Sequence, residues 1–168
     1  MTGLPRGARA VVITVSDRSS AGERPDLSGP LAAELLAALG FDVGPVVVVP
    51  DVVADVEAAL TAAVGAGADL VVTTGGTGIA PRDVTPEATA RVLDTVVPGI
   101  AEAIRAYSRE AVPTSALSRG TAGLSGRTLL VNLPGSPGGV RDGVAVLATL
   151  VGHALAQLRG AGDHASPG

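Results

Sequence analysis

The sequence predicts an α/β fold of three layers, in which a mostly parallel sheet has helices on both faces and includes one antiparallel strand. One observation is the alternation of short runs rich in Val, Ile and Leu with longer segments of helical periodicity, which is the βαβ pattern. Another is composition, because 46% of the 168 residues are hydrophobic but only 1% are aromatic. The core must therefore consist of small aliphatic side chains, which let helices lie close to a sheet. A chain of this length favours a single domain.

Strands and helices alternate through the first half of the chain. The expected elements are a strand at 10–15, a helix from Ser28 to a stop at Gly40, a strand at 41–49 interrupted at Gly44 and Pro45, a helix at 52–64 and a strand at 68–74. The connections between them are short and rich in Gly, Pro, Asp and Ser, as turns require. This alternation of strands and helices predicts that the strands pair in parallel and that helices cover both faces of the sheet.

The second half of the chain departs from this regular alternation. We expect helices at 86–94 and 100–111, separated by Pro98 and Gly99, then strands at 121–125 and 128–133 and a long helix at 140–159. Gly126 lies between the last two strands, which form either a hairpin or two sheet strands of which one is antiparallel. These elements delimit one domain at 10–159, with a flexible N-terminus at 1–9 and a disordered tail at 160–168.

The composition excludes several classes of function. The net charge is −4, no basic cluster is present and aromatic residues are nearly absent, so nucleic acid is not an expected partner. All twelve basic residues are Arg, and the chain has no Cys, which excludes lysine and thiolate nucleophiles. The N-terminal apolar run is too short for a signal peptide, and the uncharged stretch at 143–158 reads as a buried helix. We therefore expect a cytoplasmic protein without a membrane segment.

A glycine-rich loop follows the expected strand at 68–74. Its centre is Thr74, Gly75, Gly76, Thr77 and Gly78, and it leads to Thr85, which we expect to cap the next helix. Glycines allow positive φ and let backbone N–H groups approach an anion, to which the two threonines add hydroxyls. An ordinary strand-to-helix loop is the alternative. The hydroxyls favour anion binding, and the spacing does not match the dinucleotide-binding GxGxxG.

Polar clusters follow four of the expected strands. Ser16 and Asp17 come after the first strand, Asp51 after the second, the loop 75–83 after the third and 132–138 after the last. In open parallel sheets the carboxyl ends of the strands hold the ligand. Each cluster alone is weak evidence, because every strand must end in a turn, but their coincidence predicts a site at this edge.

Asp51 and Asp83 are the candidate metal ligands. If both carboxylates converge beside the glycine loop, they could hold Mg²⁺, which takes one or two protein carboxylates and fills its shell with water and substrate phosphates. The alternative is that Asp51 and Asp83 cap the helices that follow them. Arg82, beside Asp83, is a candidate phosphate clamp or an ordinary solvated residue.

Two further segments offer anion contacts. Ser118 and Arg119 form a compact oxyanion site or, equally, belong to a polar loop, and the turn of Pro134, Gly135 and Ser136 offers a hydroxyl donor or is only a turn. Neither His153, in an apolar helix, nor His164, in the tail, is expected to be catalytic.

The order and content of these motifs resemble the molybdopterin adenylyltransferase family of the Mog and MoaB type, which also forms a domain of gephyrin-like proteins. The resemblance covers residues 10 to about 158. It rests on TTGGTGIAPRDVTPEAT in the centre, with TVSDRSSAGERPDLSG, VVPD, VPTSALSRG and NLPGSPGGVRDG around it in the same order.

The resemblance implies an enzyme of molybdenum cofactor biosynthesis, a nucleotidyltransferase that uses Mg²⁺ and ATP to adenylylate molybdopterin and releases pyrophosphate. It places the catalytic and metal-binding aspartates at Asp51 and Asp83. Substrate contacts fall on Ser16, Asp17, the loop from Thr74 to Gly78, Ser118, Arg119 and the turn from Pro134 to Ser136.

The same resemblance implies a homotrimer, with a hexamer as the alternative, and a molybdenum-insertion protein as a candidate partner. Gly138 and Gly139 stand where many relatives have a basic residue, so Arg141 is a candidate substitute for that contact. The competing function is a catalytically inactive molybdopterin-binding or scaffold protein of the same fold.

Overall fold

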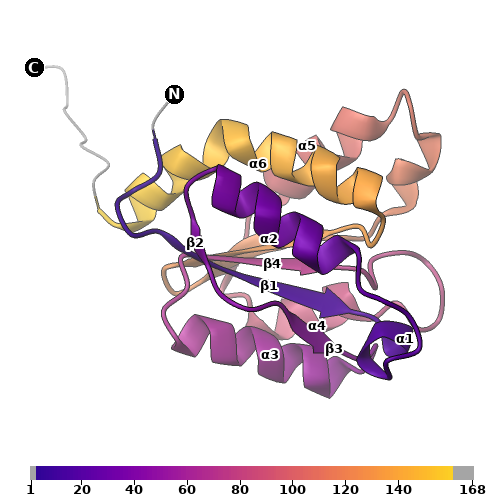
Figure 1. Ribbon diagram of the computed structural model, residues 1–168. Coiled ribbons are helices and arrows are strands. Elements are labelled where there is room, and N and C mark those ends of the chain that lie inside the picture. The colour runs from indigo at the N-terminus through magenta and orange to yellow at the C-terminus, as the bar shows by residue number, and fades with distance from the viewer. Residues whose placement is uncertain (1–2, 161–168) are drawn as a thin grey trace, which may run out of the picture.

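A computed structural model describes residues 3–160 of the chain (Figure 1). Its seven strands are β1 Arg9–Val15, β2 Asp42–Val43, β3 Val47–Val49, β4 Leu70–Thr74, β5 Thr95–Val96, β6 Ala122–Ser125 and β7 Thr128–Leu133. Its helices are α1 Asp17–Ser20, α2 Ser28–Ala38, α3 Val53–Gly65, α4 Thr85–Val92, α5 Pro98–Ser108 and α6 Pro137–Leu158, with a 3₁₀ helix, η1, at Pro113–Leu117. The predicted alternation of strands and helices is confirmed.

The strands form one sheet in the order β2-β1-β4-β7-β6-β5, and β3 also pairs with β1 beyond β2. All pairs are parallel except β5 with β6 and β6 with β7. Strand β6 is therefore the one strand that runs against the others. The predicted hairpin around Gly126 and the predicted antiparallel strand are the same feature, because β6 and β7 pair directly at Ser125 and Thr128.

Helices cover both faces of the sheet, which gives the predicted three layers (Figure 1). One core lies between the sheet and helices α2, α5 and α6, and a smaller core lies between the sheet and α3 and α4. Successive residues of β4 alternate between the two cores, since Leu70 and Val72 belong to the first and Val71 to the second. Most of the buried side chains are Ala, Val, Leu and Ile, as the composition predicted.

Helix α6 is long and apolar enough, by length and composition, to cross a membrane, and 44% of its most apolar window is buried inside the protein. It packs against α2 and α5 and contributes Val140, Leu147 and Leu155 to the core. This packing accounts for its apolar composition, so the reading of 143–158 as a buried helix agrees with the structure.

The expected strand at 41–49 is two short strands, β2 and β3, and the break falls at the predicted interruption of Gly44 and Pro45. Other local predictions were wrong. Strand β5 was missed, since two residues carry no periodicity. Thr85 does not cap α4 but is its first residue, and its hydroxyl donates to the Gly75 carbonyl at 2.9 Å.

The ends of the expected domain also differ from the prediction. Strand β1 begins at Arg9, Ala8 is buried, and the Arg6 carbonyl accepts a hydrogen bond from Arg159 Nη1 at 2.9 Å. These contacts stand within the segment 1–9 that we expected to be flexible. Of the expected tail at 160–168, residues 161–168 lie outside the part that the structure describes.

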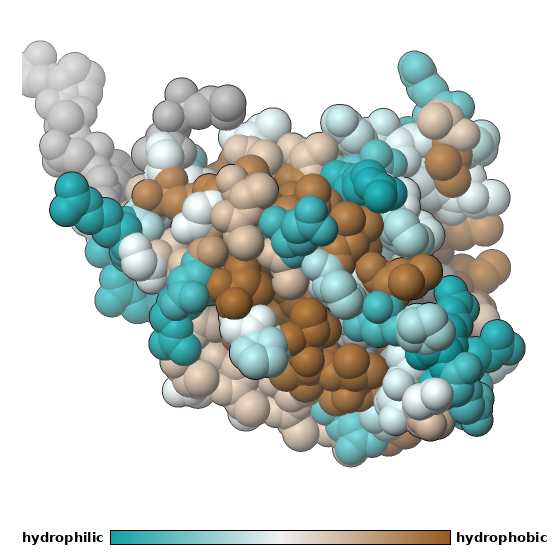
Figure 2. Space-filling view, in the orientation of Figure 1, coloured by the Kyte–Doolittle hydropathy of each residue, from teal (hydrophilic) through white to brown (hydrophobic). Residues whose placement is uncertain are grey.

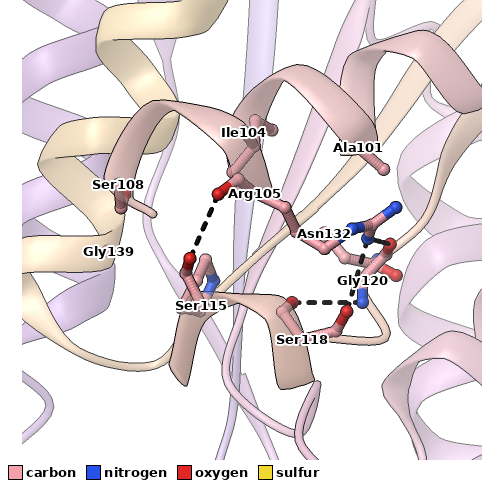
Figure 3. A pocket seen from close by; sticks show the side chains of 10 residues that line it. Ala101, Ile104, Arg105, Ser108, Ser115, Ser118, Gly120, Asn132 and Gly139 are labelled. Carbon is pink, nitrogen blue, oxygen red and sulfur yellow. Dashed lines mark hydrogen bonds between the residues drawn. The ribbon is translucent and has the colours of Figure 1, made fainter. Parts of the chain in front are cut away.

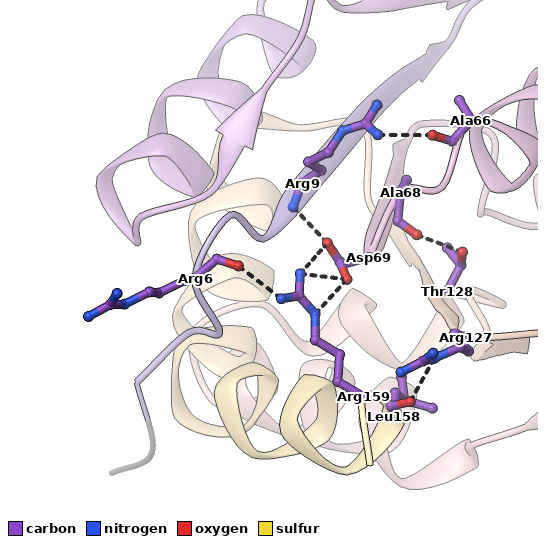
Figure 4. A network of polar contacts seen from close by, with 9 residues as sticks. All are labelled: Arg6, Arg9, Ala66, Ala68, Asp69, Arg127, Thr128, Leu158 and Arg159. Atoms are coloured by element: carbon purple, nitrogen blue, oxygen red, sulfur yellow. Dashed lines mark hydrogen bonds and ion pairs between the residues drawn. The ribbon is translucent and has the colours of Figure 1, made fainter. Parts of the chain in front are cut away.

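An arginine network lies at the amino-terminal edge of the sheet (Figure 4). Arg159 donates to both carboxylate oxygens of Asp69, and the backbone N–H of Arg9 donates to Asp69 Oδ2 at 2.9 Å. Arg9 Nη1 and Arg127 Nε donate to the carbonyls of Ala66 and Leu158, where helices α3 and α6 end. The network satisfies the free carbonyls of two helix ends and ties them to the sheet.

Figure 2 shows that apolar surface gathers over the middle of the face seen in Figure 1, between α2 and α3. Strand β3 lies at this edge of the sheet, and its Val47 and Val48 are 40% and 38% exposed. The edge strand thus leaves apolar side chains at the surface.

Candidate functional site

The four predicted polar clusters meet at the carboxyl edge of the sheet. Strands β1, β3, β4 and β7 are parallel, and their pairing aligns Val15 with Val49 and Thr74 with Leu133. The loops that follow these strands therefore leave the sheet side by side. The prediction that they converge is confirmed by this register, which brings together loops from distant parts of the chain.

The glycine loop has the backbone that its sequence predicts. Gly75 and Gly76 have φ values of +89° and +65°, which only glycine adopts readily. A Cβ at Gly75 would lie 2.4 Å from the carbonyl oxygen of Val15, so the loop also needs glycine to pass close to β1. The turn after β7 packs against it, because a Cβ at Gly135 would lie 3.1 Å from Gly75 Cα. The glycine loop and the turn after β7, both of them predicted, thus form one continuous surface.

Asp51 and Asp83 both border this loop. A Cβ at Gly76 would lie 3.1 Å from Asp51 Oδ1, and a Cβ at Gly78 would lie 2.8 Å from Asp83 Oδ2. The capping alternative is wrong for both, because the N-caps of α3 and α4 are Val52 and Val84, without side-chain cap hydrogen bonds. Asp83 Oδ2 instead accepts from the backbone of Ala80 at 3.0 Å. The carboxylates belong to the loops and not to the helices.

Asp17 links the first loop to Asp51. The backbone N–H of Asp17 donates to Asp51 Oδ2 and the backbone N–H of Asp51 donates to Asp17 Oδ1, each at 2.9 Å. Arg82 lies 2.5 Å from Asp17 Oδ2 in an exposed ion pair, and this hydrogen bond lowers the pKa of Asp17. Arg82 is therefore paired with a carboxylate, so the phosphate-clamp reading would require it to exchange partners.

Burial raises the pKa of Asp51, against the hydrogen bond from Asp17, and the charges of Asp17 and Asp83 raise it further. A carboxylate whose charge is disfavoured in this way is suited to a cation. No group of three or more His, Cys, Asp or Glu side chains is placed to hold a metal within residues 3–160. A pair suffices for Mg²⁺ when substrate phosphates complete its shell, so Asp51 and Asp83 fit that ion.

Arg119 differs from its expected role. Its guanidinium donates to the carbonyls of Gly78 and Asp83 at 2.7 and 2.8 Å and pairs with Glu87, which lowers the pKa of Glu87. Its own backbone N–H donates to the Thr77 carbonyl at 2.8 Å. Arg119 therefore holds the glycine loop and the Asp83 segment together, and most of its donors are already used.

Arg105 fixes the loop that carries Arg119. Its Nη1 donates to the carbonyls of Ser118 and Gly120 at 3.3 and 3.0 Å, from helix α5 (Figure 3). Ser118 Oγ lies within 3.3 Å of the Gly120 N–H. Hydrogen bonds thus run from α5 through the 118–120 loop to Asp83, a connection between segments far apart in sequence.

Two cavities flank the glycine loop. The larger, of about 400 Å³, is a groove that includes Thr77, Gly78, Ser118, Pro134 and Ser136 in its lining. Most of its remaining lining is apolar or small, and it comprises Ile79, Ser108, Val112, Thr114, Ser115, Leu117, Gly138, Gly139 and Asp142. A small apolar pocket of about 30 Å³ adjoins it, and its lining includes residues of α5 together with Ser115 and Ser118 (Figure 3).

The second cavity, of about 200 Å³, lies on the other side of the loop against Ser16, Thr74, Gly75 and Gly135. Its lining is more polar, and it also includes Val15, Ser19, Arg24, Pro25, Asp26, Leu27, Ser28 and Pro137. Nine of the twelve predicted substrate residues are therefore divided between the two cavities, and the other three, Asp17, Gly76 and Arg119, line neither.

Two predicted contacts, Thr74 and Ser136, have partners within the protein, and a third, Arg141, lies away from the site. Thr74 is fully buried and its hydroxyl lies 2.8 Å from Ser28 Oγ, so it joins the strand to α2. Ser136 Oγ accepts from Gly139 N at 3.1 Å as the N-cap of α6. Arg141 is exposed and lines neither of the two cavities beside the glycine loop.

Residues that the sequence interpretation passed over also line the site. Asp26 accepts hydrogen bonds from Thr14 Oγ1 at 2.7 Å and Gly29 N at 3.0 Å, and it lines the polar cavity. Asp142 lines the groove from α6. Asp26 lies within the motif TVSDRSSAGERPDLSG and Asp142 within NLPGSPGGVRDG, and neither follows a strand directly, so neither had a signal of its own.

Comparison with known proteins identifies relatives of this chain. Residues 11–153 match a family model described as "Probable molybdopterin binding domain". A molybdopterin adenylyltransferase of Pyrococcus furiosus is 42% identical over 160 residues, which cover 92% of this chain and 94% of that protein. A molybdenum cofactor biosynthesis bifunctional protein of Synechococcus elongatus is 42% identical over 97% of this chain, and the chain spans about half of that relative, 51% of its length.

The fold of a solved relative agrees. The structure of the molybdopterin biosynthesis Mog protein from Mycobacterium ulcerans superposes with a TM-score of 0.86 at 52% identity, covering 90% of this chain and 99% of that one. A CinA protein of Thermoplasma acidophilum, at 21% identity and a TM-score of 0.65, shares the fold alone.

Proposed function

Because the chain belongs to the molybdopterin-binding domain family, we propose that it is a molybdopterin adenylyltransferase of molybdenum cofactor biosynthesis. The observation that carries the proposal is the placement of Asp51 and Asp83 against the same glycine loop, at Gly76 and Gly78. Relatives that are named molybdopterin adenylyltransferase are 42% identical, including one that matches nearly over its full length.

The two cavities suit two substrates that meet at the loop. The groove is large and mostly apolar, and it suits the pterin of molybdopterin with its phosphate toward Thr77, Gly78 and Ser136. The polar cavity suits ATP, and its Arg24 makes no ion pair with any residue of the described range 3–160. The α-phosphate of ATP then lies near Gly75 and Gly135, which line the polar cavity beside the glycine loop.

The reaction requires little covalent chemistry from the protein. A terminal phosphate oxygen of molybdopterin forms a bond to the α-phosphorus of ATP, the bond from that phosphorus to the bridging oxygen breaks, and pyrophosphate leaves. The nucleophile is already ionised at neutral pH, so no general base is needed. The glycine loop, which Arg119 braces, holds the reacting groups in line, which is the main contribution that nucleotidyl transfer asks of an enzyme.

Mg²⁺, when bound, would neutralise charge on the phosphates between the carboxylates of Asp51 and Asp83. Asp17 holds Asp51 through paired backbone hydrogen bonds, and Ala80 N–H and Arg119 hold the Asp83 segment. Each carboxylate is therefore oriented before any ligand arrives.

The assembly and location follow from the same proposal. We propose a cytoplasmic homotrimer, with a hexamer as the alternative, which passes its product to a molybdenum-insertion protein. The exposed Val47 and Val48 of β3 support self-association, because they leave an apolar strand edge at the surface. Light scattering of the purified protein distinguishes the trimer from the hexamer.

Incubation of the purified protein with molybdopterin, Mg²⁺ and ATP tests the activity. We expect pyrophosphate and adenylylated molybdopterin in equal amounts, and neither product when Mg²⁺ is chelated. Binding of molybdopterin without pyrophosphate release would refute the enzyme and favour the competing function, a molybdopterin-binding or scaffold protein.

A further inference from the structure

Asp142 stands out among the residues of the groove. It is the one charged residue in the lining, as far as residues 3–160 are concerned, and the rest of the wall is apolar, small or hydroxylic. Its Oδ2 accepts a hydrogen bond from Ser108 Oγ at 2.6 Å. No ion pair within the described range uses Asp142. The structure thus holds a carboxylate in an apolar groove without a neutralising cation.

The hydrogen bond from Ser108 uses one carboxylate oxygen and leaves the other. An ionised carboxylate has about four acceptor positions on its two oxygens, so Asp142 keeps acceptor capacity toward the groove. Ser108 comes from α5 and Asp142 from α6, and both line the same cavity. The Ser108 hydroxyl therefore fixes the orientation of the Asp142 carboxylate, which keeps acceptor positions for further donors.

The groove has two chemically different ends. Thr77, Gly78 and Ser136 lie at the glycine loop and at the start of α6, where N–H groups and the helix dipole favour an anion. Asp142 lies six residues beyond Ser136 on the same helix, which is about 9 Å along the axis at 1.5 Å per residue. A matching ligand is anionic at one end and rich in hydrogen-bond donors at the other.

On the basis of the proposed function, we infer that Asp142 is a specificity-determining residue that recognises the 2-amino-4-oxo edge of the pterin. That edge presents a ring N–H and an exocyclic amine side by side, both of them donors. A carboxylate accepts both at once, in the bidentate geometry that also makes its pairs with arginine specific. A 2,4-dioxopteridine has a carbonyl in place of the amine, and this carbonyl would face the carboxylate without a donor.

The experiment measures binding of molybdopterin in the absence of ATP, by equilibrium dialysis, for the full chain and its variants. Asp142→Asn keeps the size of the side chain and an acceptor for Ser108 but loses the charge and one acceptor oxygen. We expect its Kd for molybdopterin to rise about tenfold to a hundredfold, the loss typical of a hydrogen bond to a charged group. Ser108→Ala, which keeps the carboxylate, should change the Kd by only a few-fold.

A second measurement separates recognition from a structural link between α5 and α6. Pterin and 2,4-dioxopteridine are compared as competitors of molybdopterin binding, and wild-type protein should prefer pterin while Asp142→Asn loses the preference. A structural link would instead make both variants equally weak, lower both melting temperatures and leave the preference unchanged. Glu102→Gln, at an exposed position of α5, is the control that should behave as wild type.

The outcomes distinguish this inference from the proposed function. Wild-type protein that binds molybdopterin but does not adenylylate it would refute the enzyme alone, because the dialysis contains no ATP. An Asp142→Asn variant with wild-type affinity and preference would overturn the inference alone. Wild-type protein that does not bind molybdopterin would overturn both.

Discussion

At the amino-terminal edge of the sheet, arginines surround one carboxylate, whereas at the carboxyl edge carboxylates gather around a glycine loop. Asp69 receives three hydrogen bonds from Arg159 and one from the Arg9 backbone (Figure 4). Burial alone would raise the pKa of Asp69, but these hydrogen bonds and the arginine charges lower it. At the other edge burial and like charges raise the pKa of Asp51. The arrangement around Asp69 stabilises the fold, whereas the negative charge at the carboxyl edge is available to bind a ligand.

This difference predicts that substitutions at the two edges have different effects on activity and stability. A change at the carboxyl edge should remove activity with little loss of stability, and a change at the amino-terminal edge should do the reverse. Active sites commonly retain such unfavourable charge arrangements because function requires them.

Asp83→Asn should have the largest effect. We expect adenylyl transfer to fall on the order of a hundredfold or more, because the charge that positions the metal and the phosphates is lost. Affinity for molybdopterin should stay within a few-fold, since the groove does not include Asp83. Pyrophosphate release and dialysis measure the two quantities. The matched control is Asp94→Asn, which changes another aspartate that accepts a backbone N–H, from Gly126, in a turn. Unchanged turnover of Asp83→Asn would overturn the assignment of the carboxylates.

Asp69→Asn should act on stability alone. We expect the free energy of unfolding to fall by about 1–3 kcal/mol at pH 7, because hydrogen bonds between charged groups are lost at a partly buried site. Because its pKa is lowered in the fold, Asp69 stabilises the protein above its usual pKa of 3.8, and this contribution is lost as the pH falls through the lowered value. The difference between wild type and variant in urea unfolding should therefore shrink at acidic pH.

The control for Asp69→Asn is Glu57→Gln, in the exposed pair with Arg91, which should cost less than about 0.5 kcal/mol. Adenylyl transfer by Asp69→Asn should match that of wild type when both are folded. Loss of activity in the folded variant would erase the distinction between the two edges.

Arg119→Lys tests whether an arginine can brace the carboxyl edge of the sheet. Arg119 lies at this edge but donates to carbonyls, as the arginines of the amino-terminal edge do. A lysine ammonium cannot reach the Gly78 and Asp83 carbonyls and Glu87 together. We expect kcat to fall about tenfold while KM for molybdopterin changes little, since one to two hydrogen bonds that position Asp83 are lost. Arg91→Lys is the control. A raised KM with unchanged kcat would show instead that Arg119 contacts the substrate, as the sequence suggested.

Local patterns predicted much of the fold and the meeting of the loops at the carboxyl edge of the sheet. Periodicity and turn residues located all the longer elements, and the glycine loop with Asp51 and Asp83 followed from their positions after strands. The parallel sheet brings such positions together whatever the remaining sequence, which explains the success. Strand β5, with two residues, has no period to detect.

Side-chain partners were less predictable, because they come from distant segments. The acceptors of Arg119 lie 32 to 41 residues away, so its role as a brace could not be read from SRG alone. The Ser108–Asp142 contact spans 34 residues and joins two helices whose order on the sheet had to be known first. Thr85 shows the same limit at short range, since its hydroxyl bonds to Gly75 and not to its own helix.

The effect of Asp51→Asn on stability is the smallest of the expected effects and the most direct test of the charge difference between the edges. A raised pKa means that the fold binds the proton more tightly than the unfolded chain, so ionisation of Asp51 lowers stability as the pH rises from the usual value of 3.8 through the raised one. The neutral amide removes this penalty and still accepts from Asp17 N–H. We expect the Tm to rise by about 2 °C at pH 7 and to equal that of wild type near pH 4. Added Mg²⁺ should raise the Tm of wild type more than that of the variant, because the ion relieves the same repulsion. A lower Tm at pH 7 would mean that Asp51 is held for stability as Asp69 is, and the two edges would then not differ in kind.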